Sequence, residues 1–326
     1  MSFVNLATAR TISALKGAHY TFPRALRLRE GMEWIITDYY AKAALRRPFE
    51  ARGLLVTGPS RIGKTTEIRR QLDALNDGTT RMPDGRLARF VSVVLKGLLS
   101  WKDLGIHTLR EGLNYPAEGR LTQREVWDRV VTQAREQGVI GIHYDECQHI
   151  FPKKTGEARV MILDSFKSLL KQPEWPLMLI LSGVDSLVHH ITSEEQLAYL
   201  LRPVSLSEIA LHRQDDLNEL ASLCHAYADK AGLNFSRLNT RDFYDRLTCA
   251  CANRWGLVIE LLIDAFVIAL SEEASEPGPQ HFCLAFTRRT GLREDYSPFS
   301  IDSYEKLFEP QKIFEIWEKK RLAIKT

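Results

Sequence analysis

Residues 58–65, GPSRIGKT, constrain the fold more than any other part of the sequence, because they match the pattern G-x-x-x-x-G-K-[ST]. The apolar run GLLVT precedes them, and the segment TTEIRRQLDAL, which has a helical pattern, follows. Glycines in such a loop let successive backbone N–H groups turn towards a phosphate, and the positive end of the helix adds to the attraction. This order predicts an α/β fold with a phosphate-binding loop (P-loop) and disfavours a glycine-rich turn that only caps a helix.

The P-loop pattern gives roles to individual side chains. Lys64 is predicted to reach the β and γ phosphates of ATP and to act in catalysis, and the Thr65 hydroxyl is predicted to bind Mg²⁺. The predicted nucleotide-binding residues of the loop and of the helix start are Gly58, Pro59, Ser60, Arg61, Ile62, Gly63, Lys64, Thr65 and Thr66.

A P-loop needs a second strand that delivers a carboxylate to the magnesium ion, and the sequence VIGIHYDE provides one farther along the chain. Asp145 is predicted to hold Mg²⁺ as a Walker B acid. Glu146 is the predicted catalytic group that polarises the water attacking the γ-phosphate. Apolar residues followed by two acids are a common pattern, and here the P-loop upstream makes it specific.

The same stretch raises a metal-site alternative, because residues 141–151 read GIHYDECQHIF. On an extended strand His143 and Asp145 share one face, while Cys147 and His149 fall in the loop that follows. No second Cys/His cluster in the sequence completes four ligands, so structural zinc is disfavoured. We expect His143 to be a core or interface histidine and His149 to be a loop residue near the nucleotide.

Two further polar residues are candidates for catalysis. Ser182 ends the apolar run LMLILSG and is predicted to be a sensor of the γ-phosphate or the attacking water; the alternative is a serine that only starts a turn. Arg202 follows in EEQLAYLLRPVSL. In assemblies whose site lies between subunits, such an arginine completes the neighbour's site; the alternative is a surface salt bridge.

Apolar runs and helical patterns alternate along the first two thirds of the chain, which predicts a five-stranded parallel sheet flanked by helices. The predicted strands are residues 53–57, 90–95, 139–144, 177–181 and 203–206. Helical patterns dominate after Glu208 and predict a small all-helical lid. The predicted domains are an N-terminal extension with its leading helix (1–50), the nucleotide-binding α/β domain (51–207), the helical lid (208–290) and a C-terminal tail (291–326).

Composition narrows the class of protein. The net charge of only +3 argues against a polycation that coats nucleic acid, so any DNA contact must be local. Five cysteines without a CxxC pair favour reduced thiols and a cytoplasmic protein. The longest apolar run, residues 257–270, is too short to span a bilayer and contains Glu260 and Asp264, so no membrane partner is expected.

The motifs GPSRIGKT, IGIHYDE, LILSG and LLRP, followed by a helical lid, resemble those of AAA+ ATPases, and residues 18–290 resemble the TniB/TnsC family of transposition regulators. The flanking segments HYTFPRALRLREGMEWIITDYY, QHIF and LRPVSLSEI carry the narrower resemblance. It implies an ATP-dependent regulator of DNA transposition that forms a homo-oligomeric ring or helical filament around double-stranded DNA. The regulator would link a target-selector protein of the TniQ type to the transposase, with hydrolysis favouring disassembly. Its length is similar to that of forms found in CRISPR-associated elements.

The resemblance also implies site residues outside the P-loop. An arginine of the lid is expected to sense the nucleotide near the start of RWGLVIELL, where Arg254 stands two residues before the best-aligned position, Gly256. Segments LKGLLSWKDLG and AEGRLTQRE are expected to line the DNA channel, and each candidate has an ordinary solvated residue as its alternative. The candidate DNA-binding residues are Lys96, Lys102, Arg120 and Thr122.

Two questions stay open at this level. The tail helix places Ile313, Phe314, Ile316 and Trp317 on one face, which either docks in a partner's groove or packs on the protein's own body. Rival functions for the P-loop are a phosphotransferase, a replication or loader-type AAA+ protein, and a signalling or defence switch that binds ATP with little turnover. A switch of this kind would not need Glu146.

Overall fold

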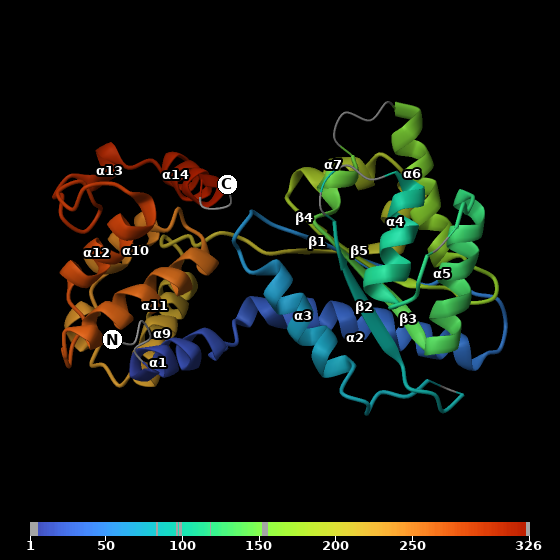
Figure 1. The fold of residues 1–326 in the computed structure, drawn as a ribbon, viewed down its shortest axis with the longest axis horizontal. Helices are drawn as coiled ribbons and strands as arrows, with labels where there is room; N and C mark the ends of the chain where they lie inside the picture. Colours follow the sequence, from blue (N-terminus) through green and yellow to red (C-terminus); the bar gives the residue numbers. More distant parts are fainter. Residues whose placement is uncertain are drawn as a thin grey trace. The chain divides into compact units, whose positions relative to one another are not determined.

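The computed structural model describes residues 6–82, 84–95, 97, 100–117, 119–151 and 156–323. The chain forms two compact units, an α/β unit of Pro23–Ser207 and a helical unit that combines Met1–Phe22 with Glu208–Thr326 (Figure 1). The structure therefore divides the residues before Ala51, predicted as one extension, between the two units.

The centre of the α/β unit is a five-stranded parallel sheet with the order β2-β3-β4-β1-β5, which confirms the predicted fold class. Every residue of β1, β3 and β4 is buried, as expected for strands covered by helices on both faces. The strands are β1 Gly53–Thr57, β2 Arg89–Val94, β3 Val139–Asp145, β4 Met178–Gly183 and β5 Leu201–Ser205.

Helices connect the strands and cover the sheet (Figure 1). Contacts pair α2 with β1 and β5, α3 with β2, α5 with β3, and α6 with β4. The helices of this unit are α2 Pro23–Ala44, α3 Lys64–Leu75, α4 Trp101–His107, α5 Gln123–Gln137, α6 Gly156–Leu170, α7 Ser186–Thr192 and α8 Glu195–Leu200, with a π-turn η1 at Thr108–Gly112 and a 3-10 turn η2 at Cys147–Ile150.

The helical unit packs around α11, Trp255–Ser271, whose sequence is apolar on nearly all sides. Such a helix must be covered all round, and α1, α9 and α12 do so; Figure 1 shows the dark blue α1 beside α9 and α11. The N-terminal helix thus belongs to this unit. Its elements are α1 Leu6–Gly17, α9 Gln214–Ala231, η3 Ser236–Leu238, α10 Arg241–Ala250, α11, α12 Pro279–Thr290, α13 Tyr304–Leu307 and α14 Pro310–Ala323.

The C-terminal tail packs on its own helical unit, which decides between the two alternatives for its apolar face. Ile313 and Trp317 of α14 are buried, and the Trp317 indole N–H donates to the carbonyl of Ala250 at 3.1 Å. The Arg289 guanidinium lies 5.4 Å from the Trp317 ring centroid. The helix is therefore part of the unit's core.

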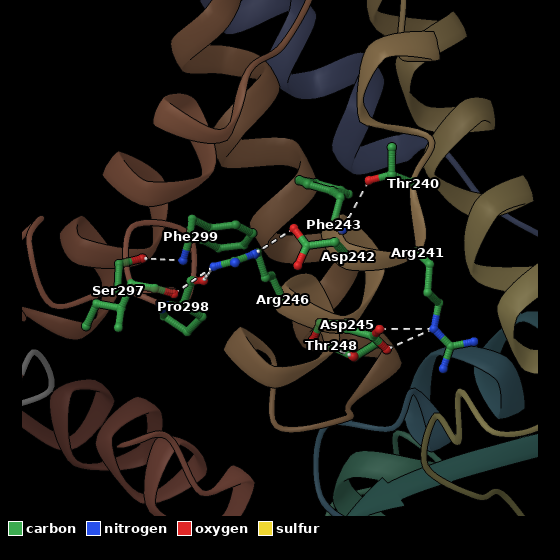
Figure 2. Close-up of polar contacts among 11 residues, drawn as sticks. Thr240, Arg241, Asp242, Phe243, Asp245, Arg246, Thr248, Ser297, Pro298 and Phe299 are labelled. Carbon is green, nitrogen blue, oxygen red and sulfur yellow. Dashed lines mark hydrogen bonds and ion pairs between the residues drawn. The ribbon is translucent and has the colours of Figure 1, made fainter. Parts of the chain in front are cut away.

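Arg246 of α10 anchors the segment before α13 (Figure 2). Its Nη1 donates to the carbonyls of Pro298 and Ile301, each at 2.8 Å, and its Nε donates to the Asp242 carboxylate at 2.8 Å. The guanidinium also stacks 4.7 Å from the Tyr304 ring centroid.

None of the helices among the described residues is long and apolar enough to cross a membrane.

Candidate nucleotide-binding site

The P-loop joins the end of β1 to the start of α3, and its glycines are needed for geometric reasons. A Cβ on Gly58 would lie 2.3 Å from the carbonyl oxygen of Leu206, so only glycine lets the two backbones approach. Gly63 takes φ +103°, a region that L side chains rarely adopt, and no side chain caps the helix that begins at the next residue. The start of α3 therefore lacks a side-chain cap, and such helix starts favour anions.

Lys64 lies inside the loop with only 5% of its surface exposed. Its ammonium donates to the carbonyls of Gly58 at 2.7 Å and Pro59 at 2.9 Å. Neutral carbonyls are weaker partners for an ammonium than phosphate oxygens are. The loop thus holds its cation at the place where a phosphate would take over these contacts.

Arg24 of α2 is a second cation at this loop, and sequence reasoning missed it. Its Nη2 donates to the carbonyl of Ile62 at 3.1 Å. The residue lies far from the motif in sequence, and only the packing of α2 against β1 reveals it.

Thr65 and Asp145, predicted to hold Mg²⁺, lie in contact. The Thr65 hydroxyl donates to Oδ2 of Asp145 at 2.7 Å, and Asp145 is almost fully buried at the end of β3. A hydroxyl and a carboxylate side by side are the oxygen donors that Mg²⁺ prefers, so the residues fit this ion. The described residues contain no group of three or more His, Cys, Asp or Glu suited to hold a metal.

Glu146 follows in a left-handed conformation with φ +59°, and its backbone N–H donates to Asp145 Oδ1 at 3.0 Å. Its carboxylate accepts a hydrogen bond from the side-chain amide of Gln148. The carbonyl oxygen of that amide in turn accepts from the backbone N–H of Val184 at 3.3 Å. Gln148 thus connects the predicted catalytic acid to the loop after β4. In the sequence, this role is indicated by the position of Gln148, two residues after Glu146.

Ser182 and His143 join the same cluster. The Ser182 hydroxyl donates to Asp145 Oδ1 at 2.6 Å, and His143 Nε2 lies 2.8 Å from Ser182 Oγ. Nδ1 of His143 lies 2.8 Å from the hydroxyl of Ser92 on β2. Burial lowers the pKa of His143 to about 4, against the opposing effect of the Asp145 carboxylate. The histidine expected in the core is there, and it also contacts the site.

Arg202 and Arg254 occupy different surroundings. Arg202 is exposed on the edge strand β5, with its guanidinium 5.4 Å from the ring centroid of Trp34 on α2. Arg254 precedes α11 in the helical unit, is mostly buried, pairs with Glu208 and lies over the ring of Phe314. Their proposed roles, completing a neighbour's site and sensing the nucleotide, stay predictions.

The predicted DNA contacts are placed in part, because Lys96 lies outside the described residues. Lys102 is in the first turn of α4 and Arg120 is exposed before α5. The Thr122 hydroxyl caps α5, accepting from the backbone N–H of Glu125 at 3.3 Å and donating to its carboxylate at 2.8 Å. The pattern T-x-x-E signals such a capping box in sequence, and it gives Thr122 a structural role.

The starts of α4 and α5 lie close together. Hydrogen bonds from the backbone N–H and the hydroxyl of Thr122 lower the pKa of Glu125, and the positive charges of Arg129 and Lys102 lower it further. The two helices also pack on each other. The described parts of the two segments predicted to line a DNA channel, at the starts of α4 and α5, are thus neighbours.

Comparison with known proteins agrees with this architecture. Residues 46–191 match the family model described as AAA domain, and no curated protein matches the chain. The Cdc6p structure from Pyrobaculum aerophilum is similar with a TM-score of 0.59 and 14% identity, over 84% of this chain and 69% of that chain.

Two structures from Aeropyrum pernix are also similar. The ORC1 protein in complex with DNA gives a TM-score of 0.58 and 15% identity, over 88% of this chain and 70% of that chain. The ORC2 protein in ADPNP-ADP complexes gives a TM-score of 0.58 and 14% identity, over 84% and 70%. Identities this low show the fold, which is an AAA+ P-loop fold followed by a helical region.

Proposed function

We propose that the protein is an AAA+ ATPase that binds ATP with Mg²⁺ in the P-loop site, assembles on double-stranded DNA and regulates DNA transposition. The observation that carries the ATPase is the contact of Thr65, Asp145 and Ser182 beside the P-loop lysine. These groups come from two neighbouring strands, β3 and β4, and from α3, the helix after the P-loop. Their arrangement presents a cation for phosphates, oxygen donors for Mg²⁺ and a buried hydroxyl in one place.

Each of these residues would have its own role in ATP hydrolysis. Lys64 would exchange the carbonyls of Gly58 and Pro59 for the β and γ phosphates. Thr65 and Asp145 would hold Mg²⁺, which supplies charge neutralisation for the phosphates when it is bound. Glu146 would orient and polarise the attacking water, once its carboxylate leaves the amide of Gln148.

Several features support assembly on DNA. Arg202 stands exposed on an edge strand, where a second subunit of a ring or filament can reach it. Lys102 and Arg120 belong to two neighbouring helix starts, where cations would contact phosphates without reading sequence. The transposase, a target selector of the TniQ type and the cytoplasmic location are proposed from the sequence resemblance to TniB/TnsC proteins.

The first test measures ATP hydrolysis of the wild type, Lys64→Ala and Glu146→Gln. We expect Lys64→Ala to lose nucleotide binding. Glu146→Gln should bind ATP and lose turnover by about a hundredfold or more, since general acid–base catalysis contributes on this order. Turnover that Glu146→Gln leaves unchanged would remove Glu146 from the mechanism, and a wild type that binds ATP with little turnover would favour the ATP-binding switch.

The second test addresses DNA. Electron microscopy with a non-hydrolysable ATP analogue should show rings or filaments that grow longer when duplex DNA is added. Lys102→Glu with Arg120→Glu should weaken DNA retention and spare nucleotide binding. Arg135→Glu is the matched control, because Arg135 lies in the last turn of α5. Equal DNA retention by all three proteins would contradict this placement of the DNA surface.

The third test addresses transposition itself. Addition of the protein and ATP should stimulate the transposase of its own element only with the matching target selector. DNA-bound filaments that recruit a replicative helicase and not the transposase would favour the loader-type alternative.

A further inference from the structure

A row of hydrogen bonds crosses three neighbouring strands near their C-terminal ends. It runs from Ser92 on β2 to His143 on β3, and from there to Ser182 on β4. Ser182 then bonds Asp145 Oδ1 at 2.6 Å. His143 and Ser182 are fully buried, so water does not compete for these contacts.

The direction of each bond follows from the number of protons available. An ionised aspartate only accepts, so the single hydroxyl proton of Ser182 points to Asp145. Oγ of Ser182 must then accept from His143, which places the imidazole proton on Nε2. Nδ1 of His143 is left as an acceptor for the Ser92 hydroxyl. The row therefore has one consistent arrangement, in which His143 fixes the orientation of Ser182.

The row also fixes the Asp145 carboxylate. Its Oδ1 accepts from Ser182 and from the backbone N–H of Glu146, and its Oδ2 accepts from Thr65. Rotation of the carboxylate would break these bonds at once. The oxygen beside Thr65 is thus held towards the side where Mg²⁺ would bind.

We propose that His143 is a positioning residue for ATP hydrolysis, which aligns Ser182 and, through it, the Asp145 carboxylate. This inference rests on the proposed ATPase function. The general pattern of the P-loop and Walker B strand does not call for an imidazole at this place; an apolar residue would fill a buried strand position as well. His143 instead uses both ring nitrogens in hydrogen bonds, one of them with the predicted sensor Ser182. The alignment that these bonds impose on Ser182 explains why an imidazole stands at this position.

Tyr144 gives a matched structural control on the same strand. It is also fully buried and bonds a threonine hydroxyl, Thr108 Oγ1, at 2.9 Å. As the next residue of β3 it points to the opposite face, away from Asp145. Tyr144→Phe therefore removes a buried strand hydrogen bond without touching the row, and should lower the melting temperature with kcat unchanged.

The test measures kcat, KM and ATP affinity of five variants at positions 143 and 182. His143→Leu should lower kcat by about tenfold, the loss expected for a bond worth about 1.4 kcal/mol, while ATP affinity stays within about threefold. His143→Gln carries an amide N–H near the place of Nε2 and should keep most of the activity. His143→Asn carries it near Nδ1 and should not, which keeps the test valid if His143→Leu fails to fold. The double variant His143→Leu/Ser182→Ala should match Ser182→Ala alone, because His143 acts through Ser182.

A second readout does not depend on turnover. The Mg²⁺ concentration needed to support binding of fluorescent mant-ADP should rise several-fold in His143→Leu and stay unchanged in Tyr144→Phe. Wild-type hydrolysis with unchanged kcat and Mg²⁺ dependence in folded His143→Leu overturns this inference and leaves the ATPase intact. An additive loss in the double variant also overturns it. A wild type that binds Mg²⁺ and nucleotide but shows no hydrolysis overturns the ATPase, and the mant-ADP titration then decides the role of His143.

Discussion

The hydroxyl of Thr65 donates to the Asp145 carboxylate at 2.7 Å, although 80 residues separate the two in sequence. One residue is the second of α3 and the other is the last of β3. The parallel order of the sheet brings these ends together, because the carboxyl ends of its strands meet at one edge.

The contact predicts opposite outcomes for two substitutions at one position. Thr65→Ala removes the hydroxyl and should reduce Mg²⁺-dependent ATP turnover by at least about tenfold, since a metal ligand and a charge-assisted hydrogen bond are lost together. Thr65→Ser keeps the hydroxyl and should stay within about threefold of wild type. Turnover measured across a Mg²⁺ titration checks this, and equal turnover of both variants would speak against Thr65 as a ligand.

Arg202 and Arg52 form a natural pair for testing catalysis in trans. Both lie at the β1/β5 edge with an aromatic ring, Arg202 over Trp34 and Arg52 4.7 Å from the centroid of Tyr199. Arg202→Ala should lower turnover of the assembled protein by about a hundredfold or more, as for other arginines that contact a γ-phosphate, and Arg52→Ala should not.

A mixing experiment locates the defect. Subunits carrying Arg202→Ala keep their own P-loop, and subunits carrying Lys64→Ala keep their arginine. Mixing the two inactive proteins should restore part of the turnover. Absence of any recovery, in mixtures that co-assemble, would place Arg202 outside the neighbour's site.

A comparison of two arginines of α10 distinguishes a residue that anchors the tail from one that forms only a surface ion pair. Arg246 bonds two backbone carbonyls of the tail, whereas Arg241 forms an exposed i,i+4 pair with Asp245 at 3.0 Å (Figure 2). Arg246→Ala should destabilise the helical unit by about 2 to 3 kcal/mol, because two partly buried acceptors lose a charged donor. Arg241→Ala should cost less than about 1 kcal/mol. Urea unfolding followed by far-UV circular dichroism checks this, and similar costs would contradict the anchoring role.

Buried thiols predict that stability falls in alkali. All five cysteines are free, and burial raises the pKa of Cys147, Cys224 and Cys251. Unfolded thiols ionise near about 8.5, so above that pH the unfolded chain releases protons that the native state keeps. The free energy of unfolding should therefore be steady up to about pH 8 and fall between about 8.5 and 10.

Denaturation at several pH values measures this slope, and Cys224→Ala with Cys251→Ala should flatten it. Thiol reagents should label the native protein slowly and the unfolded protein fast at pH 8, and fast labelling of native Cys147 would contradict its burial.

The central strands could be predicted because a parallel sheet covered on both faces leaves continuous apolar runs. The start of β5 is harder to predict from sequence, because the strand is only partly buried and the apolar residues of α8 directly precede it without a break. The predicted start at residue 203 therefore lies two residues after Leu201, where the strand begins. Edge strands lack the covering that makes the signal continuous.

The candidate site shows the same limit. Lys64, Thr65 and Asp145 stand in motifs whose spacing carries the chemistry, so sequence suffices to name them. The bond between His143 and Ser182 depends on the register of β3 against β4, where His143 pairs with Ile180. Register is a property of the folded sheet, and no local pattern at either residue reveals it.

The exit from β5 has a mechanical consequence for the P-loop. The backbone N–H of Leu206 donates to the carbonyl of Thr57 at 2.8 Å, and its own carbonyl covers Gly58. The chain passes into the helical unit just afterwards, between Ser207 and Glu208. The chain that leads to the second unit is thus hydrogen-bonded to Thr57, the residue directly before the phosphate loop, and its backbone packs against Gly58, so a pull on this connection would act on the backbone where the loop begins.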